Sequence, residues 1–196
     1  MPIDLNRVLI VFALESETRD YWGDVPVRYC GIGKVNAAYR LTKFLGEWRK
    51  DKQSDPSLVL NLGSAGSSSF KAGETINCTR FIQRDFDVTP LGVDAYTTPF
   101  ESAPPPVIST PQRYEAYAEG ICGTGDNFVT DGQMNGWNVV DMEAYALAKV
   151  CALENINFGC LKFITDGIDG HAAATWEASL LDASRSLREG LGRIVA

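Results

Sequence analysis

The chain has 196 residues, of which 45% are hydrophobic and 22% charged, and this size and composition predict one soluble globular domain spanning residues 1–196. Its 18 basic and 25 acidic side chains give a net charge of −7, which argues against a surface that binds nucleic acid or anionic lipid. The only histidine, His171, excludes a zinc site built from several histidines, so any acid–base chemistry is expected to rest on carboxylates.

Strands and helices are expected in alternation along the first half of the chain. Apolar runs rich in Val, Ile and Leu predict strands, and a 3.6-residue apolar period predicts helices. The strands are expected at residues 7–14, 25–31, 58–62 and 74–84, the last at a sheet edge, and a helix is expected at 34–49. The strand at 58–62 is followed by GSAGSSS, which is typical either of an ordinary tight turn or of a loop that offers backbone N–H groups to a ligand.

The second half of the chain begins with a proline-rich segment, residues 90–111, in which three consecutive prolines exclude a helix. Beyond it we expect a short helix at 112–118, a short strand at 120–123, an apolar helix at 139–153, a strand at 158–164 and an amphipathic helix at 175–194. This alternation predicts an α/β fold with a largely parallel or mixed sheet.

The cysteines and the N-terminus bear on the compartment. The five cysteines form no CxxC pair, so neither a disulfide framework nor a metal-binding ribbon is expected, and they are interpreted as core residues of a protein in a reducing cytoplasm. Residues 1–7 lead directly into a short apolar run, so we expect neither a signal peptide nor a membrane span.

Three carboxylates stand at informative positions. Glu17 and Asp166 each follow a predicted strand closely, where open α/β sheets bind their ligands. Glu143 falls inside the predicted helix at 139–153, on its apolar stripe, where an unpaired charge is costly to bury. Each residue also has a structural interpretation: a solvated loop residue for Glu17, a turn residue for Asp166, and an ion-pair or helix-cap partner for Glu143.

Short motifs carry a resemblance to a known family. They are ALESE at 13–17, GIGKVNAA at 31–38, NLGSAG at 61–66, DFDVT at 85–89, GDNF at 125–128, VVDMEAYALAKV at 139–150 and LKFITDGIDG at 161–170. Together they resemble the purine nucleoside phosphorylase/nucleosidase superfamily, and within it the 5′-methylthioadenosine/S-adenosylhomocysteine nucleosidase branch. The resemblance implies a three-layer α/β sandwich with a central twisted mixed sheet, a homodimer, a small nucleoside substrate, and no cofactor or metal.

The resemblance also implies roles for individual residues. Asp166 matches the general acid that protonates the purine at N7, and Glu17 matches the residue that activates the attacking water. Substrate-binding positions are Glu143 and Met142 at the ribose, Phe128 and Val129 at the base, Ser64, Ala65 and Gly66 in the loop that approaches water and ribose, and Asp141. Cleavage of an N-glycosidic bond through an oxocarbenium-like state suits an acid on one side, an activated water on the other and nearby negative charge. His171 is expected to be a solvated loop residue.

Water is favoured over phosphate as the nucleophile. Asn61 stands where hexameric phosphorylases of the superfamily carry an arginine, and Glu15 and Glu17 would repel phosphate, although Arg80 or Arg84 could supply a cation. The segments that usually surround the 5′ substituent are short, so methylthioadenosine, S-adenosylhomocysteine, 5′-deoxyadenosine and futalosine all stay open as substrates. The alternatives to an adenosine-nucleoside hydrolase are a phosphate-dependent phosphorylase, a futalosine-type hydrolase, and a non-catalytic nucleoside-binding or storage protein.

Overall fold

The computed structural model describes residues 3–168 and 172–195. Its strands are β1 (Val8–Phe12), β2 (Val27–Tyr29), β3 (Leu58–Gly66), β4 (Thr75–Gln83), β5 (Val107–Ser109), β6 (Ala118–Thr124), β7 (Val139–Asp141) and β8 (Phe158–Asp166). Its α-helices are α1 (Lys34–Lys52), α2 (Ala144–Leu153) and α3 (Ala172–Ile194), and its 3₁₀ turns are η1 (Leu5–Arg7), η2 (Glu15–Thr18) and η3 (Thr89–Leu91).

The strands form one mixed sheet. β1 runs parallel to β2 and β3, and β3 runs parallel to β8. β4 pairs antiparallel with β8 and parallel with β6, while β7 pairs parallel with β6 and antiparallel with β3 through Gly66 and Val140. The pairing β3–β8–β4–β6–β7–β3 is therefore a closed circuit, and the predicted mixed α/β sheet is confirmed.

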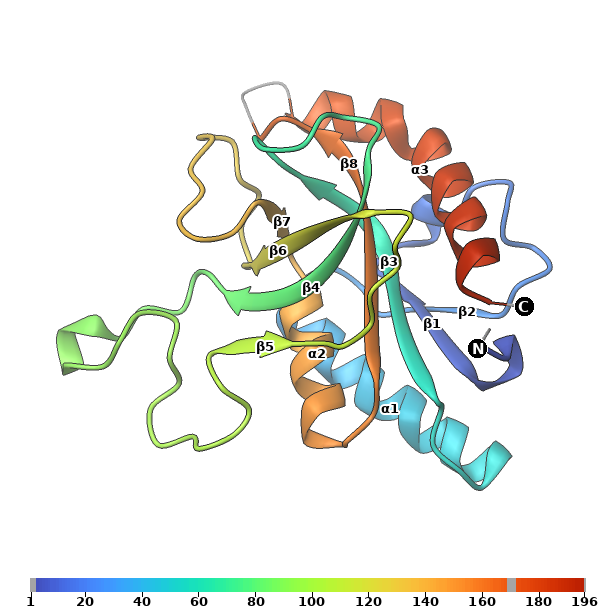
Figure 1. Cartoon of the computed structure of the whole chain (residues 1–196), viewed down its shortest axis with the longest axis horizontal. Coiled ribbons are helices and arrows are strands. Elements are labelled where there is room, and N and C mark those ends of the chain that lie inside the picture. The colour runs from blue at the N-terminus through green and yellow to red at the C-terminus, as the bar shows by residue number, and fades with distance from the viewer. Residues whose placement is uncertain (1–2, 169–171, 196) are drawn as a thin grey trace.

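Helices cover both faces of the sheet and give a three-layer arrangement (Figure 1). Alternate residues of β1 point to opposite sides: Leu9 and Val11 pack in one apolar cluster with α1 and α2, whereas Ile10 and Phe12 pack in the other with α3. A strand buried on both faces must be apolar at every position, which explains the uninterrupted run in β1. No helix within residues 3–168 and 172–195 combines the length and apolar character that crossing a bilayer requires.

Two predicted strands are longer in the structure, and one is placed differently. β3 and β8 continue to Gly66 and Asp166, so GSAG is the end of a strand and not the turn that its composition suggests. Gly66 permits this extension, because a Cβ atom there would overlap the side chain of Ile168. The edge position expected for residues 74–84 is wrong, since β4 pairs with β5, β6 and β8.

Two helix predictions are also corrected. Residues 112–118 form no helix, because the backbone N–H of Tyr114 donates to the side chain of Asn77 at 3.0 Å and Ala118 already begins β6. Residues 139–141 form β7, so α2 begins only at Ala144 and Glu143 is its N-cap residue. All five cysteines are buried free thiols, which confirms their interpretation as core residues.

Candidate active site

A cleft of about 230 Å³ lies where the C-terminal ends of β3 and β8 meet β7 and the turn after β1. Every residue that the sequence singles out as catalytic or substrate-binding lines it: Glu17, Ser64, Ala65, Gly66, Phe128, Val129, Asp141, Met142, Glu143 and Asp166. The fold thus gathers at one place side chains that are up to about 150 residues apart in the sequence, in accord with ligand binding beyond strand ends.

Glu17 lies in η2, directly after β1, and its side chain is buried. Its Oε2 accepts hydrogen bonds from the backbone N–H groups of Ala13 at 3.2 Å and Leu14 at 3.1 Å. Its Oε1 accepts from the backbone N–H and the hydroxyl of Ser64, both at 2.8 Å. The solvated-loop interpretation is therefore wrong, and the carboxylate is held rigidly against the end of β3.

Glu143 enters the cleft from the junction between β7 and α2. It makes no side-chain capping bond to α2, and its Oε1 instead accepts from the backbone N–H of Gly33 at 2.9 Å. Burial, together with the nearby charge of Asp141, raises its pKa to about 8, against the opposing effects of Lys162 and of the Gly33 hydrogen bond. The raised pKa favours the protonated form of the Glu143 carboxyl group at neutral pH.

Asp141 forms a buried ion pair with Lys162, Oδ2 to Nζ at 2.8 Å. Its carboxylate also accepts from the Thr124 hydroxyl at 2.6 Å and from the Ala144 N–H at 2.8 Å. Burial acts to raise the pKa of Asp141, but the charge of Lys162 and these hydrogen bonds outweigh it and hold the pKa below its ordinary value. Burial likewise acts to lower the pKa of Lys162, yet the charge of Asp141 keeps it well above its ordinary value. Asp141 thus lines the cleft as an ionised group whose charge is compensated from behind.

Asp166 is the last residue of β8 and is buried. Its Oδ2 accepts from the Thr165 hydroxyl at 2.8 Å and its Oδ1 from the Ile168 N–H at 3.0 Å. Across the cleft wall, a Cβ atom built on Gly66 would lie 2.8 Å from Asp166 Oδ1, so only glycine leaves this carboxylate its space. A turn-like contact to Ile168 exists, but the position is a strand end that faces the cleft.

The remaining walls are aromatic and apolar, with one basic side chain among the described lining residues, Arg84. Its guanidinium lies against Gly125 and donates to the carbonyl of Gly123 and to both the side chain and the carbonyl of Asn127. Phe128, the next residue, is 49% exposed at the cleft and free to meet a flat ligand. Arg80, the other cation considered, is exposed on β4 away from the lining.

Sequence reasoning missed two residues of this site. Trp176, on α3, lines the cleft and donates its indole N–H to the Ser64 hydroxyl at 2.8 Å. Lys162 stands behind the cleft wall as the partner of Asp141. Neither contact has a local sequence signal, because the partners are separated by 112 and 21 residues. His171 lies outside the described residues.

Comparison with known proteins gives consistent matches. The family model for the phosphorylase superfamily matches residues 19–196. The 5′-methylthioadenosine/S-adenosylhomocysteine nucleosidase of Haemophilus influenzae (strain PittGG) is 31% identical over 214 residues, covering 97% of this chain and 90% of that protein. The corresponding nucleosidase of Staphylococcus aureus (strain MRSA252) is 27% identical over 192 residues, covering 88% and 82%.

Two solved structures share the fold. A 5′-methylthioadenosine/S-adenosylhomocysteine nucleosidase from Helicobacter pylori, solved with butyl-thio-DADMe-Immucillin-A, superposes with a TM-score of 0.82 at 20% identity, covering 95% of this chain and 96% of the other. A futalosine hydrolase from the same organism superposes with a TM-score of 0.80, also at 20% identity and with the same coverage.

Proposed function

Because the chain belongs to the phosphorylase superfamily, and within it to the 5′-methylthioadenosine/S-adenosylhomocysteine nucleosidase branch, we propose that it hydrolyses the N-glycosidic bond of adenosine-type nucleosides modified at the 5′ position. The observation that carries this proposal is the convergence of three buried carboxyl groups, Glu17, Glu143 and Asp166, on one cleft. No cofactor is required for this chemistry.

The proposed mechanism divides the work between two ends of the cleft. Asp166 donates a proton to N7 of the purine, so that the base leaves as a neutral molecule and the ribose takes on positive charge. Glu17 accepts a proton from the water that attacks the anomeric carbon. Glu143 bonds the ribose hydroxyls beside Met142, while Phe128 stacks on the base and the backbone of Val129 meets its edge.

Water is the proposed nucleophile because the cleft offers little to hold phosphate. Arg84 already donates to the Gly123 and Asn127 oxygens, and Lys162 is paired with Asp141. At the position of attack, phosphate would meet Glu17, and two like charges at contact distance in a partly buried site repel each other strongly. A phosphorylase is therefore the weaker alternative, and the futalosine hydrolase fold match is the reason to include futalosine among the substrates.

The proposal is tested by following release of free base from methylthioadenosine, S-adenosylhomocysteine, 5′-deoxyadenosine, inosine and futalosine, with and without phosphate. Phosphate-independent release of adenine from the adenosine compounds is the expected result. Release only in the presence of phosphate would identify a phosphorylase, and no release from any nucleoside would favour a binding or storage protein. Asp166→Asn should lower turnover by more than tenfold while the far-ultraviolet circular dichroism is unchanged.

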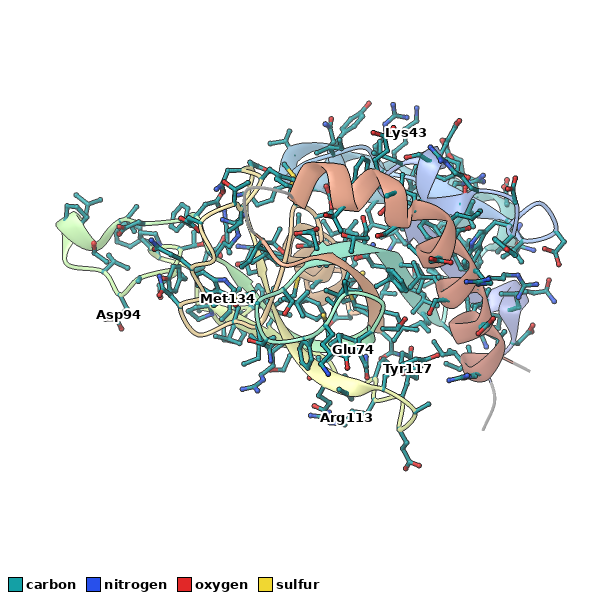
Figure 2. The ribbon with its side chains drawn as sticks, turned by 90° about the horizontal axis from the view of Figure 1, so that it is seen from above. Lys43, Glu74, Asp94, Arg113, Tyr117 and Met134 are labelled. Atoms are coloured by element: carbon teal, nitrogen blue, oxygen red, sulfur yellow. The ribbon has the colours of Figure 1, made fainter. Side chains whose placement is uncertain are left out.

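We further propose that the chain acts as a single-domain protomer of a homodimer, in the cytoplasm, within purine and methionine salvage. Apolar side chains stand exposed where α1 begins beside the cleft: Ile32, Val35 and Tyr39. The segment between β4 and β5, which carries Asp94, projects from the body of the molecule (Figure 2). Its Phe100 side chain is fully exposed. A second copy that covers these surfaces would remove their apolar area from water. Sedimentation equilibrium tests this, and Tyr39→Glu should shift a dimer toward monomer.

A further inference from the structure

A chain of hydrogen bonds connects α3 to the proposed base of the reaction. The indole Nε1 of Trp176 lies 2.8 Å from the Ser64 hydroxyl oxygen, which in turn lies 2.8 Å from Glu17 Oε1. All three side chains line the cleft. The three residues come from η2, β3 and α3, so these hydrogen bonds link three separate elements of the fold.

The chemistry of the two outer groups fixes the direction of both hydrogen bonds. An indole N–H only donates, and a carboxylate only accepts. The single hydroxyl hydrogen of Ser64 must therefore point to Glu17, while the hydroxyl oxygen accepts from Trp176. Glu17 consequently receives four hydrogen bonds, from the N–H groups of Ala13, Leu14 and Ser64 and from the Ser64 hydroxyl.

Four donors fill the acceptor capacity of a carboxylate, which has about four lone-pair sites. A water molecule that Glu17 is to activate must therefore take over one of these sites. The three N–H groups belong to the backbone and stay in place, whereas the Ser64 hydroxyl hydrogen moves by rotation about one bond. The Ser64 hydroxyl thus donates to the site on Glu17 that the attacking water needs.

We propose that Trp176 is a positioning residue for the hydrolysis, because its indole N–H holds the Ser64 oxygen beside the water site. The Ser64 hydroxyl hydrogen then rotates away from Glu17 and a hydrogen of the water takes its place, while the Ser64 oxygen stays close to both Glu17 and the water. This inference rests on the proposed function. Without the N–H, the Ser64 side chain is free to rotate away, and the Glu17 carboxylate and its water lose a fixed neighbour. Preorganised donors of this kind act on the chemical step more than on binding.

The first experiment separates positioning from packing against the substrate. Trp176→Phe keeps the ring but removes the N–H, and we expect kcat to fall about tenfold, by the same factor for methylthioadenosine, S-adenosylhomocysteine and 5′-deoxyadenosine, with KM changed less than about twofold. Trp48→Phe is the matched control, because the buried Nε1 of Trp48 has no hydrogen-bond partner in the described structure, and it should leave kcat unchanged. A change in KM that depends on the 5′ group, with kcat unaltered, would instead make Trp176 a wall of the substrate pocket and overturn the proposal.

A double-mutant cycle tests the route through Ser64. If Trp176 acts through this hydroxyl, Trp176→Phe in a Ser64→Ala background should cause no further loss of kcat. Additive losses would overturn the positioning role while leaving the hydrolase activity established. A wild-type protein that releases no base from any nucleoside would overturn the proposed function itself, so the two failures are distinct.

A spectroscopic measurement tests the hydrogen bond without reference to turnover. In a ¹⁵N–¹H spectrum, the indole resonance that disappears in Trp176→Phe belongs to Trp176. Ser64→Ala should shift this resonance, and the resonances of Trp22, Trp48 and Trp137 should stay in place. An unshifted Trp176 resonance would overturn the proposal.

Discussion

Replacing Glu143 by glutamine should make the unfolding free energy less dependent on pH. The pKa of Glu143 is raised to about 8 in the folded chain, by burial first and by Asp141 second, against an ordinary value of 4.5. The folded state therefore binds this proton more tightly than the unfolded state does. The stabilisation that results is complete below pH 4.5 and is lost as the pH rises through 8.

The magnitude follows from the two pKa values. Between them the unfolding free energy falls by about 1.4 kcal/mol per pH unit, and from pH 6 to pH 8 the loss from this one group is about 2 kcal/mol. Three neighbouring groups, Asp141, Lys162 and Cys30, titrate outside this window. The pKa of Asp141 is lowered although its burial opposes this; that of Lys162 is raised well above its ordinary value; and that of Cys30 is raised to about 12, by burial first and by Glu143 second.

The assay is equilibrium urea unfolding of wild type and Glu143→Gln at pH 6, 7 and 8 in buffers of equal ionic strength. Glutamine keeps the oxygen that accepts from Gly33 and never ionises. The difference in unfolding free energy between the two proteins therefore reports the titration of Glu143, because the contributions of all other groups cancel. Glu143→Gln should gain about 2 kcal/mol relative to wild type between pH 6 and pH 8. A difference between the two proteins that is constant over this range would refute the argument that burial holds Glu143 protonated.

Two further predictions concern the groups behind the cleft wall. Lys162→Met should cost about 3–5 kcal/mol of unfolding free energy in urea titrations, because it leaves the buried carboxylate of Asp141 unpaired. A second substitution in the same protein, Asp141→Asn, should recover part of this loss. Gly66→Ala should lower kcat, since the added Cβ would overlap Ile168 and press on Asp166, whereas Gly192→Ala, where nothing lies within 4 Å, should leave steady-state kinetics unchanged. Equal kinetics for the two alanine variants would contradict this account.

The sequence predicts most of the sheet because burial on both faces leaves a plain pattern. β1 is apolar throughout, β3 and β8 begin as mainly apolar runs, and all three strands form at the predicted segments, although β3 and β8 extend further. The pattern fails where an apolar strand leads directly into an apolar helix. Residues 139–153 read as one helix, yet the pairing of Val139 and Val140 with β6 ends at Asp141, and only then does α2 begin. Periodicity over three residues cannot separate these two states, because the competing strand pairing is a long-range contact.

The residues of the site likewise fall into those that the sequence predicts and those that it does not. The residues on strand ends are found from the sequence because topology alone brings such ends together, and this holds for Glu17 and Asp166. Lys162 and Trp176 are not found, since their roles depend on contacts with Asp141 and Ser64 that no local pattern specifies. Lys162 even occupies a strand position between Leu161 and Phe163, where a lysine suggests a solvated face and not one of the most deeply buried side chains.

The cleft gathers several carboxyl groups in an apolar setting, and the fold resolves their repulsion differently for each. Asp141 is ionised and neutralised by Lys162, Glu143 takes up a proton below pH 8, and Glu17 is surrounded by four donors. Chemically similar side chains thereby become available for the distinct roles of acid, base and ligand that we propose for them. The Glu17 carboxylate stands at the proposed position of attack, so positive charge that develops on a ribose ring is stabilised there and an approaching anion is repelled. The charge distribution that selects water over phosphate is thus the one that favours the oxocarbenium-like state itself.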